Sequence, residues 1–344
     1  MDEPDAAAAQ DRTGATPSGD GGRSVGAPET DDISRLVLQC AAPFFLKGLG
    51  GLAHLSGGDR LTALLTLAIL EANVRHVVRD PVLALRHARF DSPPPDEMRR
   101  PVNVRALAES LSLPYDAARR RVAALEAAGV CVRTAKGVYI PNSALTTEAN
   151  HQALIDGYQA METLAADLSG VAPDFDLTGG APCAADPPPM GAERLAVRVG
   201  VEYVLRFAER LAAIAGDVGQ GLVLLAILHH NYAPVFSDPV LARRHGGLSD
   251  PPPDDLLAPI SVLALAKTLG QPFETTRRQV NRLIRGRRCV RIPGGVIVSA
   301  QAMRTALARR ALLAHVGDVQ RAYGALARLG LTFGGNTTPS APDD

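Results

Sequence analysis

The sequence has only four cysteines among 344 residues, and no two of them form a Cys-x-x-Cys pair. This scarcity argues against a disulfide scaffold and a zinc finger, and it fits a reducing compartment. No basic segment followed by an apolar one opens the chain, so we expect a cytoplasmic protein. The longest apolar runs, near 61–70 and 222–228, are shorter than the roughly 20 residues of a membrane-spanning helix. We therefore expect no membrane partner.

The sequence also lacks a net charge, because 36 Lys and Arg residues balance 36 Asp and Glu residues. Overall basicity therefore gives no argument for nucleic-acid binding. With 46% hydrophobic residues, however, the chain can bury a sizeable core, and its length suggests about two domains.

Two halves of the chain repeat one another. An offset of 158 residues aligns Pro101 with Pro259, Asp80-Pro with Asp238-Pro, and Cys131 with Cys289. Without a gap, 27 of the 61 positions in 80–140 are identical to their counterparts. So long a period indicates a tandem duplication of whole domains rather than a solenoid.

Composition then sets the predicted boundaries. Segment 1–32 is rich in Asp, Gly, Pro and Ser, which predicts a disordered acidic tail. The Pro- and Gly-rich segment 169–191 predicts a linker between domains 33–168 and 192–330. Segment 331–344 is predicted to be a second disordered tail. In both copies the Asp-Pro pairs at 80 and 238 predict helix starts, because Asp caps free amides and Pro suits the first helical position.

After a triple proline, each copy predicts a helix, a turn, a second helix and a hairpin. In the first copy these are 104–111, 112–114, 115–128 and a hairpin around 135–137. The second copy repeats the order, with a hairpin around 293–295. Helical spacing places the following residues of the second helices inward: Tyr115, Ala118, Val122 and Leu125, and Phe273, Thr276, Val280 and Leu283.

These motifs resemble the winged helix-turn-helix domains of bacterial transcription regulators of the GntR and IclR kinds. The likeness is carried by Ala106-Leu-Ala-x-x-Leu and Arg119-Arg-Arg-Val-x-x-Leu, and by Ala264-Leu-Ala-x-x-Leu and Arg277-Arg-Gln-Val-x-x-Leu. It covers about 40 residues per copy. The resemblance implies a mainly α fold of two tandem helical domains, each with a β-hairpin wing, and a second helix that enters the DNA major groove. The second copy departs from the pattern at Arg287-Arg288, where a Gly and an apolar residue are usual.

Local charge supports DNA as the partner. Residues 99–137 hold 8 Lys and Arg against 3 Asp and Glu, and 257–295 hold 8 against 1. The outward face of the first copy's second helix is mostly alanine, whereas the second copy's carries several polar and basic residues. We therefore predict that the second motif reads more of the DNA sequence. The predicted DNA-contacting residues are Arg119, Arg120, Arg121, Lys136, Glu274, Thr275, Arg277, Arg278, Asn281, Arg282 and Arg285.

Other polar residues favour structural interpretations. Cys131 and Cys289 occupy equivalent apolar strand starts, which predicts buried thiols. His87 and His245 end equivalent short helices, where a cation offsets the helix dipole. No His or Cys spacing suits a metal site, and no catalytic motif recurs in both copies. We therefore expect no cofactor and no enzymatic activity.

The favoured function is sequence-specific binding of double-stranded DNA in transcriptional regulation, with the two copies acting as an intramolecular pseudo-dimer. A protein-interaction module, with arginines that meet an acidic partner, is the alternative from another class. A replication initiator with tandem winged helices is a third hypothesis. The operator, an effector and the sign of regulation stay open, as do association into a homodimer and whether the first copy binds DNA or a protein.

Overall fold

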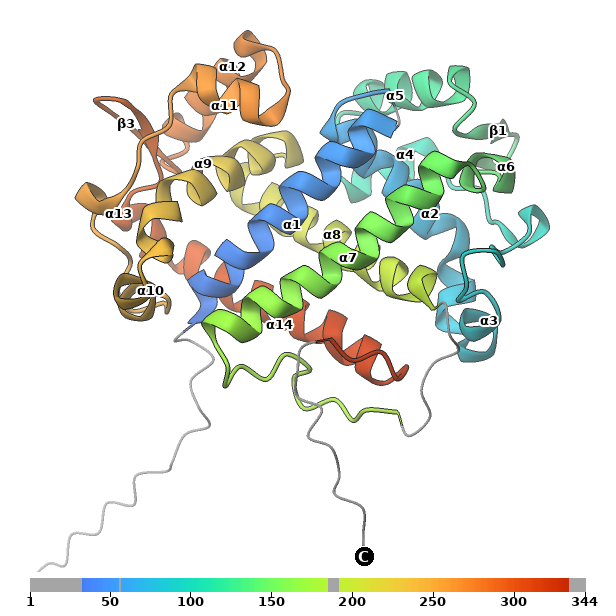
Figure 1. Ribbon diagram of the computed structural model, residues 1–344. Coiled ribbons are helices and arrows are strands. Elements are labelled where there is room, and N and C mark those ends of the chain that lie inside the picture. The colour runs from blue at the N-terminus through green and yellow to red at the C-terminus, as the bar shows by residue number, and fades with distance from the viewer. Residues whose placement is uncertain (1–32, 56, 185–191, 334–344) are drawn as a thin grey trace, which may run out of the picture.

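The computed structural model describes residues 33–55, 57–184 and 192–333. These residues form fourteen α-helices and two small antiparallel hairpins, which confirms the prediction of a mainly α fold (Figure 1). The predicted N-terminal tail lies outside the described residues.

The order of elements repeats once along the chain. The first half contains α1 (Ser34–Leu55), α2 (Arg60–Arg79), α3 (Pro81–Arg86), α4 (Val104–Ser110), α5 (Tyr115–Ala127), β1 (Val132–Thr134), β2 (Gly137–Tyr139), α6 (Asn142–Leu145) and α7 (Glu148–Val171). The second half contains α8 (Glu193–Ala215), α9 (Val218–Ser237), α10 (Pro239–His245), α11 (Val262–Leu269), α12 (Phe273–Arg285), β3 (Val290–Ile292), β4 (Gly295–Ile297), α13 (Ala300–Met303) and α14 (Ala306–Ala327). Short 3-10 helices at Asp96–Met98 and Asp254–Leu256 also correspond. The duplication therefore extends to the whole secondary structure.

The predicted Asp-Pro helix starts are confirmed in both halves. Asp80 accepts hydrogen bonds from the amides of the first turn of α3, and Asp238 does the same for α10. In each case Pro follows at the first helical position, where its missing amide costs no helical bond.

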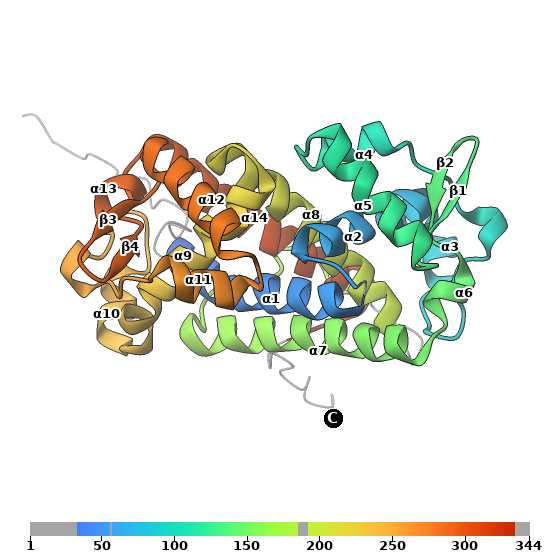
Figure 2. The same ribbon diagram turned by 90° about the horizontal axis from the view of Figure 1, so that it is seen from above.

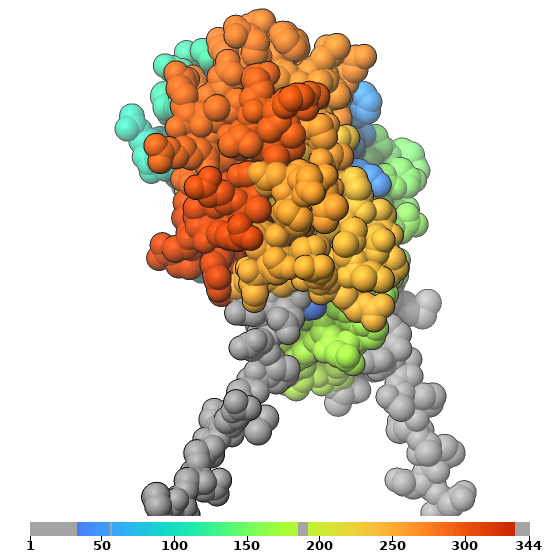
Figure 3. Space-filling view, turned by 90° about the vertical axis from the view of Figure 1, so that its left-hand side faces the viewer, coloured from blue at the N-terminus to red at the C-terminus, as the bar shows by residue number. Residues whose placement is uncertain are grey.

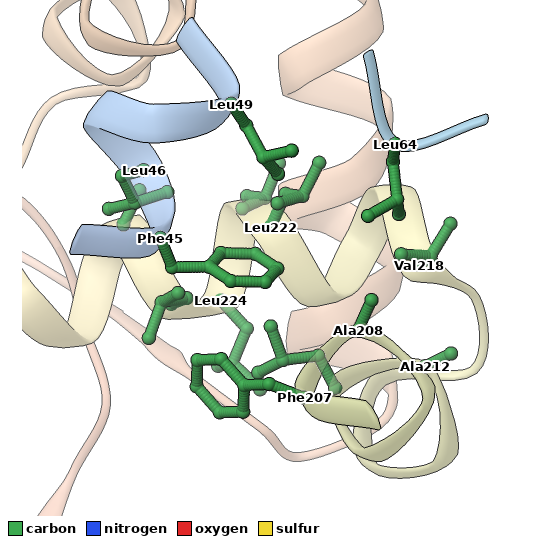
Figure 4. Close-up of a cluster of buried hydrophobic side chains, with 14 of the residues drawn as sticks. Phe45, Leu46, Leu49, Leu64, Phe207, Ala208, Ala212, Val218, Leu222 and Leu224 are labelled. Carbon is green, nitrogen blue, oxygen red and sulfur yellow. The ribbon is translucent and has the colours of Figure 1, made fainter. Parts of the chain in front are cut away.

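The helices of the two halves interleave around one core. Helix α1 packs against α9 and α14 as well as against α7, and α8 packs against α2 and α7 as well as against α14 (Figures 1 and 2). Figure 4 shows side chains from both halves in contact: the rings of Phe45 and Phe207 lie 4.9 Å apart, edge to face. The sequence predicted two domains joined by a linker, but the repeats share their hydrophobic core.

The predicted linker is partly ordered against α14. Helix α7 continues to Val171, beyond the predicted boundary, and the amide of Ala184 donates to the carbonyl of Ala327 over 2.9 Å. Gln320 donates to the carbonyl of Asp176 over 3.0 Å. Residues 172–184 are therefore a packed segment, while 185–191 lie outside the described residues.

The predicted C-terminal tail begins too early. The ring of Phe333 lies 5.5 Å from that of Tyr158 and 6.0 Å from that of Tyr323, and the amide of Leu331 donates to the carbonyl of Leu326. Residues 331–333 therefore continue the fold. The remainder of that segment, 334–344, lies outside the described residues.

Two helices, α1 and α2, are long and apolar enough to cross a membrane by length and composition, and α8 with α9 would pass as a third span bent by 91°. The apolar runs read from the sequence understated these lengths. About half of each helix's most apolar stretch, 44% for α1 and 56% for α2, is buried inside the protein.

Candidate nucleic-acid interface

Each half presents two short helices followed by a hairpin, which we call the first (102–140) and second (260–298) helix–hairpin units. In the first, Val132 pairs with Tyr139 across the hairpin, and Val102 adds a single antiparallel bridge to Val138. The bridge between Ile260 and Val296 repeats this in the second. Each hairpin thus gains a third extended segment, formed by the residues just before the first helix of the same unit.

A buried asparagine fixes each hairpin to the helix beneath it. Asn231 of α9 is fully buried, and its amide group donates to the carbonyls of Ala258 and Val296 over 2.6 and 3.1 Å. Its amide oxygen accepts from the backbone of Val298 over 2.9 Å. Asn73 of α2 does the same in the first half. Sequence reasoning missed this pair, although an identical Asn recurs in both repeats inside an apolar helix.

Glycines allow the hairpins to approach the incoming chain closely. Gly137 has φ +136°, and a Cβ there would lie 2.4 Å from the carbonyl oxygen of Val102. Gly295 occupies the equivalent position, where a Cβ would lie 2.3 Å from the carbonyl oxygen of Ile260. Lys136, which the sequence predicts to contact DNA, is exposed at the tip of the first hairpin.

The aromatic residues that open α5 and α12 are exposed. The pattern predicts Tyr115 and Phe273 inward, but they are 45% and 43% accessible. Each follows a proline and occupies the first helical position, one turn before the residues that pack. The guanidinium of Arg105 lies over the Tyr115 ring at 5.5 Å. The remaining predicted inward residues are buried: Ala118, Val122, Leu125, Thr276, Val280 and Leu283.

The outer face of α12 carries an arginine row. Arg278, Arg282 and Arg285 are exposed, and none of the three has an ion pair among the residues that the structure describes. Arg278 donates to the backbone carbonyl of Glu274, its own helix, over 3.3 Å. Spacings of four and three residues place these side chains along one face. Thr275 and Asn281, also predicted to contact DNA, are half-buried beside them, and Asn281 accepts from Arg291 at 3.5 Å.

Glu274 and Arg277 pair with each other at the start of α12. Arg277 donates to both carboxylate oxygens of Glu274, the closest contact being 2.8 Å. These hydrogen bonds lower the pKa of Glu274. The pair partly neutralises the helix start, so Arg277 is less available to phosphate than the arginine row.

Three of the six basic residues of the first unit are paired with carboxylates. Arg119 lies 3.6 Å from Asp116, and Arg133 lies 3.0 Å from Glu126. Arg121, predicted to contact DNA, donates instead to Asp59 over 2.8 Å. Arg120 is exposed and has no ion pair among the described residues. The first unit therefore offers less free positive charge than the second.

Two adjacent residues connect the helix–hairpin units. Asp59 caps the first turn of α2 and holds Arg121 of the first unit. Arg60, next in the chain, donates to the carbonyls of Thr268 and Leu269 at the end of α11 in the second unit. The beginning of α2 thus contacts both units, which fixes their positions relative to each other.

The departure at Arg287-Arg288 has a structural role. Arg287 has φ +56° where the first repeat has Gly129 at φ +71°, so the helix ends in the same conformation without glycine. Arg288 donates to the carbonyl of Ile214 at the end of α8 over 2.8 Å. Both the helix end and the first hairpin strand keep their expected places.

The second helices of the two units lie along one edge of the molecule. In Figures 1 and 2 the order across this edge is β3, α12, α5 and β1, so the hairpins are outermost. In Figure 3 the orange segment that includes α12 forms the upper end of the protein. The free arginines of α12 and Arg120 of α5 therefore belong to elements on the same edge.

Cysteines and histidines occupy structural positions. Burial raises the pKa of Cys131 to about 11 and that of Cys289 to about 12, so both are unreactive thiols at neutral pH. His87 and His245 are buried, and their Nδ1 atoms lie 3.0 Å from the carbonyls of Ser92 and Asp250. The described residues contain no group of three His, Cys, Asp or Glu side chains that could hold a metal ion.

Comparison with protein-family models, curated proteins and solved structures finds no match to this chain.

Proposed function

We propose that the protein is a sequence-specific DNA-binding regulator of transcription, whose helix–hairpin units are winged helix-turn-helix domains that act as an intramolecular pseudo-dimer. The exposed arginine row on α12 carries the proposal. Phosphate neutralisation supplies most of the sequence-independent affinity for DNA, and arginine also suits bidentate contact with guanine. Arginines of α12 that have no ion pair among the described residues, on the helix that would enter the major groove, can make both the phosphate and the guanine contacts.

The order of elements supports the assignment of the units. A buried helix, a bridging segment, two short helices and a hairpin follow one another in each half, as in winged helices. The interleaved core holds both units on one edge, as a dimer interface does in two-chain regulators.

Affinity for duplex DNA tests the proposal. We expect the double variant Arg278→Ala/Arg282→Ala to lose most of its affinity for a site selected from random DNA, measured by fluorescence anisotropy. The matched control is Arg86→Ala/Arg243→Ala, which removes two exposed arginines from α3 and α10, away from the edge that carries α12 and α5. Equal losses in the two variants would show that affinity follows net charge and not the α12 surface.

A second function, docking of a protein, is favoured for the first unit by its own surface. Its helix α5 presents Ala123, Ala124 and Ala127 outward beside the exposed Tyr115, and two of its three arginines, Arg119 and Arg121, are paired with carboxylates. A face lined mostly by alanine suits a protein partner better than it suits phosphates. Ala124→Glu should leave DNA affinity within about twofold if this face does not approach the duplex. A large loss of DNA affinity would assign the face to DNA.

A further inference from the structure

A cavity of about 650 Å³ lies between α1, α2, α7 and α8. Helices α1 and α7 pack side by side along one of its walls (Figure 2). The cavity opens beside the C-terminal half of α1, where Lys47, His54 and Leu55 are exposed. Its volume is in the range of small-molecule sites. Most of its wall is apolar, including Phe44, Leu49, Leu67, Leu70, Val74 and Val201.

The repeat provides an internal comparison for this space. The equivalent region, between α8, α9, α14 and α1, contains a cavity of only about 80 Å³. Four glycines line the large cavity, and their counterparts in the other repeat carry side chains. The glycines are Gly48, Gly51, Gly157 and Gly200, and their counterparts are Arg206, Glu209, His315 and Ala42. Of these counterparts His315 lines the small cavity, whereas Arg206 and Glu209 line a separate cavity of about 430 Å³ between α8, α2 and α4.

His315 shows how the second space is filled. It is buried, and its ring lies 4.3 Å from that of Phe207. Gly157 stands at the equivalent position, where an added Cβ would lie 3.3 Å from the side chain of Val197. At Gly48 and Gly51 an added Cβ would meet nothing within 4 Å. Gly48 and Gly51 therefore leave open space in the α1 wall of the large cavity.

Three arginines gather at one end of the cavity, where the other repeat has Leu36, Cys40 and Leu257. Two of them are satisfied: Arg194 donates to the carbonyls of residues 89 and 90, and Arg99 donates to Pro94, Asn142 and Asp96.

Arg198 is different, because its buried Nη1 atom has no hydrogen-bond partner among the described residues. Burial, followed by the charges of Arg194 and Arg99, lowers the pKa of Arg198 to about 10, so the side chain stays charged at neutral pH.

Carboxylates that line the cavity have partners elsewhere. Glu71 pairs with Arg75 over 2.6 Å, and Asp156 accepts from Gln152 over 2.7 Å. A buried cation without a counter-ion is costly, and a carboxylate is the group that satisfies a guanidinium best. The arginine end therefore fits an anionic head group, and the apolar wall fits a hydrocarbon chain.

We propose that this cavity binds a fatty acid, with its carboxylate at Arg198 and its chain along the apolar wall formed by α1, α2 and α8. Ligands with several polar groups would leave most of those groups unpaired against this wall. The proposal does not depend on DNA binding, because the cavity lies among the long helices of the shared core.

Calorimetric titration of the full chain with laurate, below its micelle concentration, tests the proposal. We expect saturable binding at one site, and much weaker binding of dodecan-1-ol, which keeps the chain but lacks the charge. Arg198→Met should weaken laurate binding about tenfold or more, because it removes a charge-assisted hydrogen bond. Arg243→Met, an exposed arginine on α10, is the control and should bind as the unmodified protein does.

A second variant keeps the test decisive if Arg198→Met does not fold. Gly48→Leu/Gly51→Leu fills the cavity from α1 without meeting a neighbour at Cβ, so it should fold and lose laurate binding. Circular dichroism and thermal melting check the fold of each variant. Absence of saturation by laurate, equal affinity for dodecan-1-ol, or unchanged binding in the folded variants would overturn the proposal.

Discussion

The guanidinium of Arg121 donates to the carboxylate of Asp59 over 2.8 Å, which ties the outer helix of the first helix–hairpin unit to the first turn of α2. Burial alone would raise the pKa of Asp59, but hydrogen bonds from Arg121 and from the amide of Thr62 lower it overall. Arg121 is thus a structural residue, although it lies within a basic motif.

Arg121→Ala should therefore cost stability without weakening DNA binding much. The ion pair is partly solvated, so we expect the free energy of unfolding to fall by about 0.5–1 kcal/mol in urea titrations near neutral pH. Because the folded-state pKa of Asp59 is lowered, this contribution is present above its ordinary pKa and is lost as the pH falls through the lowered value. A DNA-affinity loss as large as that of Arg278→Ala would contradict the structural role.

The two units should contribute unequally to specific DNA binding. Arg278→Ala/Arg282→Ala removes two free arginines, whereas Arg119→Ala/Arg120→Ala removes one that is paired with Asp116 and one that is free. Bidentate base contacts discriminate by roughly 1–3 kcal/mol each, so the α12 variant should lose more affinity for a selected site. Competition anisotropy measures both, and equal losses would refute the asymmetry.

The sequence predicted local features better than long-range ones. Asp-Pro helix starts and hairpins depend on neighbouring residues, so their residue types suffice. The partner of Arg121 lies 62 residues earlier, in another helix, and nothing local indicates it. Helical spacing places the aromatic side chains of Tyr115 and Phe273 on the inward face. They are exposed because they precede the first turn that packs against the core.

The interleaving of the halves was equally hidden from the sequence. Each repeat reads as a complete domain, because its amphipathic helices have apolar faces whatever covers them. The periodicity does not say whether Phe45 packs on its own repeat or on Phe207 of the other. The cavity escaped notice for the same reason, since isolated glycines in an apolar helix carry no signal of empty space.

Asn231 should be among the most costly polar residues to replace. Asn231→Leu leaves the carbonyl of Ala258 and the amide of Val298 without this partner, whereas the carbonyl of Val296 keeps a hydrogen bond from the amide of Ile260. Unpaired buried groups cost about 1–3 kcal/mol each, so we expect a loss of at least about 2 kcal/mol in the free energy of unfolding. Ser237→Ala, an exposed position in the same helix, is the control. A change of only a few tenths of a kcal/mol would mean that the hairpin does not depend on this anchor.

His315 predicts a loss of stability in acid. Burial lowers its pKa from 6.5 to about 4. The negative charge of Asp318 acts to raise this pKa, and the positive charge of Arg210 acts to lower it. Between these values the unfolded chain binds a proton that the folded chain does not, so stability falls as the pH falls from 6.5 to about 4.

His315→Leu should remove this part of the pH dependence. Urea titrations of both proteins across the window give the difference, which isolates the histidine from the carboxylates that titrate nearby. Parallel curves for the two proteins would show that His315 is not buried in its neutral form.

The duplicated architecture also predicts the shape of the DNA site. If α5 and α12 both approach one face of a duplex, the two contacted regions should be about one helical turn, roughly 34 Å, apart. Their outer faces differ, so selection from random DNA should recover a non-palindromic site with one well-specified half. A perfect palindrome bound by two chains would show that the repeats do not act as an internal dimer.

The salt dependence of binding to random duplex DNA tests the central claim most directly. For a protein that uses the α12 arginines on phosphates, the logarithm of affinity should fall linearly with the logarithm of salt concentration, and Arg285→Ala should reduce the slope by about one. Absence of binding at low salt would contradict DNA binding. A slope that neither Arg285→Ala nor Arg282→Ala changes would contradict DNA binding through this face.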